Sequence, residues 1–174
     1  SRPRRILLDC GLFQGRKSTR KMNWDEFPVA PDSIDAVVLS HSHIDHTGWL
    51  PRLMNQGFSG PVYATPATRD LLAIVLPDSG RIHEEDARRA NRKGYTKHKP
   101  ALPLYTQEDA IKASTQLRVA PWRTPIPIAD GITVSLSRAG HILGAASILL
   151  EFDDFARLGF LLDRGGFLLI TQSR

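Results

Sequence analysis

Cysteine, aromatic residues and long hydrophobic runs are all scarce in this chain of 174 residues, whose length fits one domain. Cys10 is the single cysteine, which excludes an internal disulfide and favours a cytoplasmic location. Aromatic residues make up 7%, and they do not alternate with basic residues as in a base-stacking tract. No apolar run approaches the ~18 residues of a membrane span, and the N-terminus lacks the apolar core of a secretory signal. We therefore expect a globular protein without membrane association.

Acidic residues are outnumbered, 18 against 23 basic residues, which gives a net charge of +5. The excess is concentrated in two segments. Residues 1–21 hold seven Lys or Arg and one acid, and residues 88–99 hold six and no acid. Such clusters suit an anionic partner such as nucleic acid, but a solvated basic surface gives the same composition. Charge alone favours the solvated surface.

The hydrophobic pattern predicts a layered α/β fold. Short apolar runs predict buried strands at 4–11, 34–40, 60–65, 117–122, 131–137, 146–152 and 158–162. Helical spacing predicts helices at 47–57, 66–76, 82–94 and 107–115. Pro77 is expected to end the second of these helices, and residues 12–33 are expected to form a loop. Because strands and helices alternate early and strands dominate late, the sheets should be mixed.

The segment L-S-H-S-H-I-D-H-T-G, residues 39–48, holds three of the six histidines, His41, His43 and His46, together with Asp45. It follows a predicted strand directly, where α/β folds place their sites. Imidazole nitrogens and carboxylate oxygens suit zinc, and manganese or iron less selectively. Four such groups on one turn can serve two ions if other segments supply the remaining ligands. A polar loop with ordinary surface histidines is the less favoured alternative.

This segment resembles the H-x-H-x-D-H motif of the metallo-β-lactamase superfamily. The resemblance implies that His41 and His43 bind one zinc ion, and that Asp45 and His46 bind a second. The segment A-G-H-I-L-G-A, residues 139–145, resembles the next superfamily motif and implies His141 as the third ligand of the first ion. Taken alone, His141 would be interpreted as a hydrogen-bonded histidine at the end of a strand, and the upstream cluster favours the ligand.

Other segments are similar to the β-CASP group of RNA-processing nucleases, and the likeness runs from about residue 5 to about residue 152. They are L-L-D-C-G (7–11), G-P-V-Y-A-T-P-A-T (60–68), D-S-G-R-I-H-E-E-D-A-R-R-A-N (78–91) and K-H-K-P-A-L-P-L-Y-T (97–106). This resemblance implies an αββα sandwich that uses two zinc ions to hydrolyse phosphodiester bonds of RNA, single-stranded RNA above all, by attack of a metal-activated hydroxide, in exo or endo mode. It also implies that Asp9 hydrogen-bonds a ligand histidine from behind, which fixes the imidazole. An Asp that caps a turn is an equal alternative for Asp9.

The tail departs from the family, in which the next strand ends in S/T-G-D and the aspartate bridges both ions. Here the strand ends in L-L-D, residues 161–163. Asp163 is thus the predicted bridging ligand and, with Asp45, a predicted catalytic residue, although an ordinary turn Asp is an equal alternative. We expect residues 1–174 to be a partial metallo-β-lactamase domain, incomplete at both ends, with the β-CASP domain absent. Two rival functions stay open: a hydrolase of a small-molecule ester, thioester or lactam, and a truncated inactive fragment.

Overall fold

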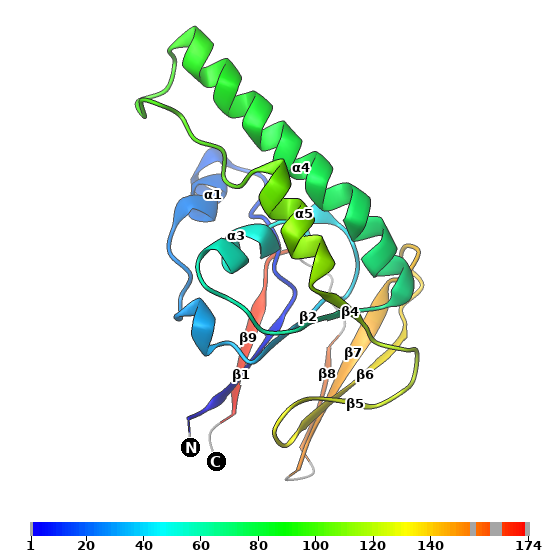
Figure 1. Cartoon of the computed structure of the whole chain (residues 1–174). Coiled ribbons are helices and arrows are strands. Elements are labelled where there is room, and N and C mark those ends of the chain that lie inside the picture. Colours follow the sequence, from blue (N-terminus) through cyan, green and yellow to red (C-terminus); the bar gives the residue numbers. More distant parts are fainter. Residues whose placement is uncertain (1, 154–155, 161–164, 173–174) are drawn as a thin grey trace.

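Two β-sheets lie against each other in the computed structural model, which describes residues 2–153, 156–160 and 165–172 (Figure 1). In the first sheet the strand order is β4-β3-β2-β1-β9, and only β9 runs antiparallel to its neighbour. Its strands are β1 (Arg4–Leu8), β2 (Ala36–Val38), β3 (Val62–Ala64), β4 (Leu117–Val119) and β9 (Leu168–Gln172). The second sheet is antiparallel, in the order β5-β6-β7-β8. Its strands are β5 (Ile126–Ala129), β6 (Ile132–Arg138), β7 (Ala146–Phe152) and β8 (Arg157–Phe160).

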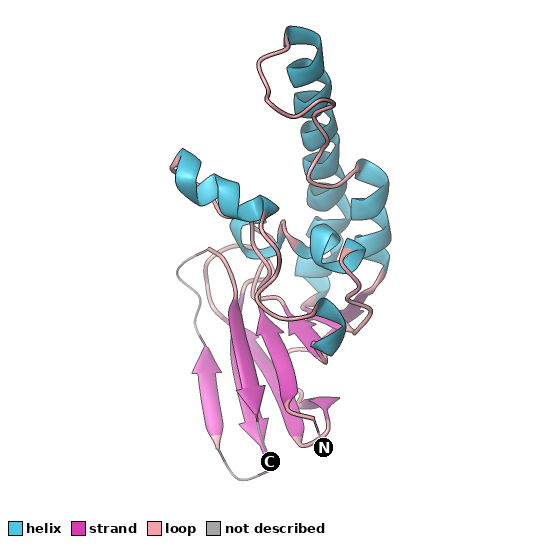
Figure 2. Cartoon of the chain, turned by 90° about the vertical axis from the view of Figure 1, so that its left-hand side faces the viewer, coloured by secondary structure: helices cyan, strands magenta, loops and turns pink. Residues whose placement is uncertain are grey.

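The helices pack on the face of the first sheet that points away from the second sheet (Figure 2). They are α1 (Lys17–Lys21), α2 (Ile44–Thr47), α3 (Leu50–Asn55), α4 (Pro66–Lys93) and α5 (Gln107–Thr115), with single 3-10 turns at η1 (Met22–Trp24) and η2 (Pro31–Ser33). Within the described ranges, no helix is long and apolar enough to cross a membrane. The segment 12–33 was expected to be a loop, but it contains the helical turns α1, η1 and η2.

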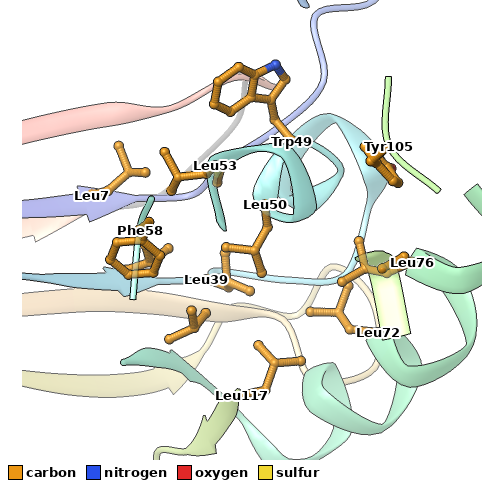
Figure 3. Packing of buried hydrophobic residues seen from close by; sticks show 14 of the residues in the cluster. Leu7, Leu39, Trp49, Leu50, Leu53, Phe58, Leu72, Leu76, Tyr105 and Leu117 are labelled. Carbon is orange, nitrogen blue, oxygen red and sulfur yellow. The ribbon is translucent and has the colours of Figure 1, made fainter. Parts of the chain in front are cut away.

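Alternation along the central strands divides the core into two layers. Leu7 of β1 points toward the helices, where it joins Leu53 and Leu72 (Figure 3). Its neighbours Ile6 and Leu8 point toward the second sheet, where they join a separate apolar cluster. A strand buried on both faces reads as an unbroken apolar run, which is why 4–11 could be recognised. The predicted layered α/β fold with mixed sheets is confirmed.

Helix α4 corrects one prediction, because it continues through Pro77 as a single helix of 28 residues. The buried residues Leu72, Leu76 and Gly80 lie on one stripe that crosses the proline, and α5 packs along α4. A Cβ at Gly80 would lie 2.6 Å from the Thr106 carbonyl oxygen, so the two segments approach closely there. Pro77 removes one backbone hydrogen bond, but tertiary packing on both sides of it holds the helix together.

The strand order sets up the site. Because β1 and β2 are parallel and adjacent, Asp9 and Ser40 emerge side by side at their carboxyl ends. The loop between β6 and β7 reaches the same edge, where the Ala146 amide donates a 2.8 Å hydrogen bond to the Ser40 carbonyl. The two sheets are thereby joined at the place where the histidine motifs lie.

Candidate metal centre

Three histidines from two distant motifs bring their ring nitrogens together. His41 Nε2 lies 3.0 Å from His43 Nδ1, and His141 Nε2 lies 3.3 Å from the same His43 nitrogen. His41 is buried, whereas His43 and His141 are exposed, so the set has a buried base and a side open to solvent. The structure thus brings the ligand nitrogens of the three histidines predicted for the first ion within 4.8 Å of one another.

The loop that carries His141 is fixed from below by two buried threonines. Thr65 and Thr68, at the start of α4, donate hydrogen bonds of 2.7 and 3.0 Å to the Gly144 carbonyl. Gly144 has a φ of 83° and a Cβ there would lie 2.6 Å from the Thr68 amide, so only glycine fits. An exposed histidine therefore stands on an anchored loop.

Asp45 and His46 form a second group beside the first, on the single turn of α2. His46 Nε2 lies 3.8 Å from Asp45 Oδ2, and the ring centroids of His41 and His46 are 4.1 Å apart. The His46 side chain is buried, whereas that of Asp45 is 38% exposed. A carboxylate open to solvent thus borders the histidine set.

The backbone around Asp45 is packed against two glycine segments. A Cβ at Gly11 would lie 1.5 Å from the Asp45 carbonyl oxygen, which excludes every other residue type at position 11. That same oxygen accepts a 2.6 Å hydrogen bond from the Gly166 amide. A Cβ at Gly165 would lie 2.7 Å from Asp45 Oδ2. Asp163 itself lies outside the described residues, so its predicted bridging position is not tested here.

Asp9 lies beneath the histidines and is fully buried. Its Oδ1 accepts a 2.7 Å hydrogen bond from the Ser40 amide, and its Oδ2 accepts from the Ser40 hydroxyl at 2.8 Å. His46 Nδ1 lies 2.6 Å from the same Oδ2. Since a carboxylate can only accept, His46 Nδ1 carries a proton, and in the neutral imidazole Nε2 is the nitrogen with a free lone pair.

Asp9 controls a second imidazole through Ser40. The Ser40 hydroxyl has a single proton, which it donates to Asp9. It must therefore accept a hydrogen bond at its 2.9 Å contact with His41 Nδ1. His41 therefore carries its proton on Nδ1 and presents the Nε2 lone pair to His43 Nδ1. One buried carboxylate thus sets the tautomers of two histidines, an assignment that follows from the hydrogen-bond network.

The electrostatics favour neutral imidazole at His41. Burial, followed by the proximity of His46, His43 and His141, lowers the pKa of His41 to about 4. Burial also lowers the pKa of His46, but the hydrogen bond and charge of Asp9 outweigh it and the net pKa is raised. Burial raises the pKa of Asp9 against the opposing hydrogen bonds. The pKa shifts thus favour the neutral form of His41, whereas Asp9 favours the protonated form of His46, whose Nε2 proton a bound metal ion would replace.

Comparison with known proteins identifies the family of this chain. A model of the beta-lactamase superfamily domain matches residues 4–144, most of the chain. The chain belongs to the metallo-β-lactamase superfamily. Ribonuclease TTHA0252 of Thermus thermophilus is 35% identical over 148 residues, which cover 85% of this chain and 30% of that protein. Transcription termination factor FttA of Methanothermobacter thermautotrophicus is 35% identical over 156 residues, covering 86% and 22%.

These relatives confirm the predicted resemblance to the β-CASP group of this superfamily, and this chain spans less than a third of their length. Among solved structures, a Cronobacter sakazakii metallo-β-lactamase with an HARLDQ motif aligns with a TM-score of 0.51 at 18% identity. The alignment covers 89% of this chain and 47% of that one, and it supports the metallo-β-lactamase fold alone.

The donor set fits a zinc ion of this superfamily. Two nitrogens at zinc distances of about 2.0–2.1 Å in tetrahedral geometry lie about 3.3 Å apart, close to the two measured separations. A second set of close donor atoms, from Asp9, His41 and His46, fits less well. Asp9 already accepts hydrogen bonds from Ser40 and His46, so its place is that of a hydrogen-bond partner behind the candidate ligands.

Sequence reasoning missed Ser40, Thr65 and Thr68. Ser40 directly precedes the first histidine of the motif, and Thr65 stands before Pro66 as the N-cap of α4. A hydroxyl at a strand end or an N-cap is a signal of local hydrogen bonding. The distant partners are set by the fold: the end of β1 brings Asp9 to Ser40, and the 139–145 loop brings Gly144 to the two threonines. Cys10, in contrast, is buried and burial raises its thiol pKa, as expected of an inert apolar neighbour.

Proposed function

We propose that this chain carries the metal centre of a zinc-dependent phosphodiester hydrolase that acts on RNA. The observation that carries the proposal is the convergence of His41, His43 and His141 in a chain 35% identical to a ribonuclease over 148 residues. Imidazole nitrogens with a carboxylate are the ligands of catalytic zinc sites. The net charge of +5 suits an anionic substrate.

Each site residue then has a distinct role. His41, His43 and His141 would hold the first ion, Asp45 and His46 would hold the second, and Asp163 would be a ligand shared by both. Bound zinc supplies a Lewis acid for the phosphate and lowers the pKa of a coordinated water. Asp45 and Asp163 orient the attacking water, for which the exposure of the Asp45 carboxylate gives access. Asp9 and Ser40 keep the ligand tautomers fixed, as metal sites commonly require of the groups behind their ligands.

The test combines metal content with a choice of substrates. Protein purified without added metal should hold close to two zinc ions per chain, and it should cleave single-stranded RNA faster than a thioester or a β-lactam. His41→Ala should abolish cleavage, whereas Gln116→Ala, which removes an exposed side chain outside the cluster, should not. Faster turnover of the thioester would favour a small-molecule hydrolase. Zinc without any turnover would favour an inactive fragment.

A further inference from the structure

A second surface of the molecule, away from the candidate metal ligands, joins the two basic segments. Two adjoining hollows share Lys21 and Trp24 as lining residues, and we call them together the Trp24 groove. The larger has a volume of about 460 Å³ and is closed on its other side by the loop after α4, through residues such as His98 and Leu102. Figure 1 shows this loop passing over α1.

The groove is lined by cations without acidic partners. Lys17, Arg20 and Lys21 line it, and no acidic residue among those described lines either hollow. Ten cations, those of residues 16–21 and 88–99, form no ion pair within the described part of the chain: Arg16, Lys17, Arg20, Lys21, Arg88, Arg89, Arg92, Lys93, Lys97 and Lys99. Elsewhere, cations such as Arg2, Arg81 and Lys112 do pair with carboxylates. The unpaired charge is therefore a local property of this surface.

An aromatic platform lies in the same groove. The Trp24 side chain is 52% exposed, an unusual state for a large apolar ring. Arg52 holds it from one side, with its guanidinium carbon 5.7 Å from the ring centroid and a 3.2 Å hydrogen bond to the Trp24 carbonyl. The indole is thus fixed in position while half of its surface stays open to a ligand.

The opposite wall is held just as firmly. Asn91 of α4 forms two hydrogen bonds with the backbone of Ala101, accepting from its amide at 2.7 Å and donating to its carbonyl at 3.0 Å. These bonds tie the loop that contains His98 back onto the helix. A groove with two anchored walls presents its charges and its ring in a fixed arrangement, which reduces the entropy lost when a ligand binds.

We propose that the Trp24 groove binds single-stranded RNA, with phosphates on Lys17, Arg20 and Lys21 and a base stacked on Trp24. Fixed aromatic rings within a positive groove are how proteins hold single strands without base-specific contacts. An acidic peptide would use the charges but not the ring. The choice of RNA among nucleic acids rests on the proposed function. None of the candidate metal ligands lines either hollow, so this is a separate binding site.

The test measures binding in EDTA, where metal-dependent cleavage cannot occur. The probe is a fluorescein-labelled oligouridine of about 12 nucleotides, within the range of known single-strand sites, followed by anisotropy. Trp24→Leu should raise the Kd about 5- to 150-fold, which is the stacking contribution of one base expressed as a ratio. Trp24→Phe, which keeps an aromatic ring, should retain most of the affinity.

The charge component has its own matched variants. Lys17→Gln combined with Lys21→Gln should reduce the slope of log K against log salt by about 1.4, since each phosphate contact on a single strand contributes about 0.7. Arg118→Gln removes one exposed cation of β4, outside the groove, and should leave the slope nearly unchanged. Wild-type affinity in Trp24→Leu, equal binding of duplex RNA or oligodeoxythymidine, or displacement by polyglutamate at equal charge would each overturn the proposal.

The two proposals fail separately. His41→Ala removes the buried histidine of the metal cluster and should bind oligouridine like the wild type in EDTA. If that variant loses binding while Trp24→Leu keeps it, RNA is held at the metal centre and the groove proposal is wrong, but the proposed function stands. If the chain binds oligouridine through Trp24 yet neither holds zinc nor cleaves RNA, the groove stands and the proposed function fails.

Discussion

Replacing Asp9 by Asn should separate metal affinity from fold stability. The substitution keeps the shape of the side chain, and Asn tolerates the left-handed backbone at this position, where φ is 57°. With Oδ1 still accepting from the Ser40 amide, the new NH₂ group faces the Ser40 hydroxyl and His46 Nδ1, which lie 2.8 and 2.6 Å from the present Oδ2. Both contacts must then reverse direction.

The reversal moves two protons to the wrong nitrogens. His46 must accept at Nδ1 and carry its proton on Nε2, and Ser40, now free to donate, moves the His41 proton to Nε2 as well. Both Nε2 lone pairs that would bind zinc are lost, while all the buried hydrogen bonds can still form. Changes behind a metal ligand typically cost about 10- to 100-fold in affinity. Because two ligands are affected here, we expect the upper end of that range or more.

The assay is competition for zinc with a chromophoric chelator, alongside urea unfolding of the metal-free protein. We expect a loss of zinc affinity of about 100-fold. The free energy of unfolding should change by only about 1 kcal/mol, since no buried group is left unpaired. Ser40→Ala serves as the control, because it frees His41 alone and should weaken zinc binding less. Unchanged zinc affinity in Asp9→Asn would refute the tautomer argument.

Three further predictions follow from particular contacts. Thr68→Val removes one of the two hydrogen bonds to the Gly144 carbonyl and should lower zinc affinity about 10-fold by titration, whereas Thr68→Ser should not. Burial lowers the pKa of His83, and its Nε2 has no partner among the described residues. The unfolded chain therefore takes up a proton near pH 6.5 that the folded chain resists, and stability falls as pH drops below that value. Urea unfolding at pH 7.5 and 5.5 should show a smaller loss in His83→Phe than in the wild type; an equal loss would mean that His83 does not contribute. Gly11→Ala forces a methyl group toward the Asp45 carbonyl oxygen and should destabilise the fold by about 1–3 kcal/mol or more in urea unfolding; a stable variant that binds zinc normally would contradict the close packing.

The fold was largely predictable where local patterns and tertiary packing agree. The apolar run at 4–11 predicts a buried strand, and the capping box of Thr106 and Asp109 accompanies a helix found at its predicted bounds, 107–115. The helix end predicted at Pro77 was wrong because the sequence shows only the backbone hydrogen bond that the proline removes. The packing of α4 on α5, which offsets that loss, involves residues far apart in the sequence. Strand β9 was missed for a related reason, since its partner β1 lies at the other end of the sequence.

The sequence could predict which histidines would lie together in the candidate site, but not the groups that hold them in place. Three histidines within six residues indicate a metal site by their chemistry alone. His141 could be predicted as a ligand only because this cluster was already recognised. The roles of Ser40 and Thr68 depend on loops that meet after folding. The Trp24 groove shows the same limit: Trp24 lies close in sequence to the cations that line the groove, but its opposite wall, residues 96–102, comes from a distant segment that meets them only after folding.

Asp9 shows why a protein would keep a residue that local rules disfavour. A non-glycine residue with positive φ is uncommon, and burial raises the pKa of the Asp9 carboxyl, so the charged form is disfavoured there. An asparagine would relieve the charge, and a glycine would relieve the backbone strain. Neither could hold protons on Nδ1 of His46 and, through Ser40, of His41. Strain of this kind gathers where function requires it. A residue with both of these costs therefore lies directly behind the histidines, because there its charge directs two lone pairs toward the proposed metal centre.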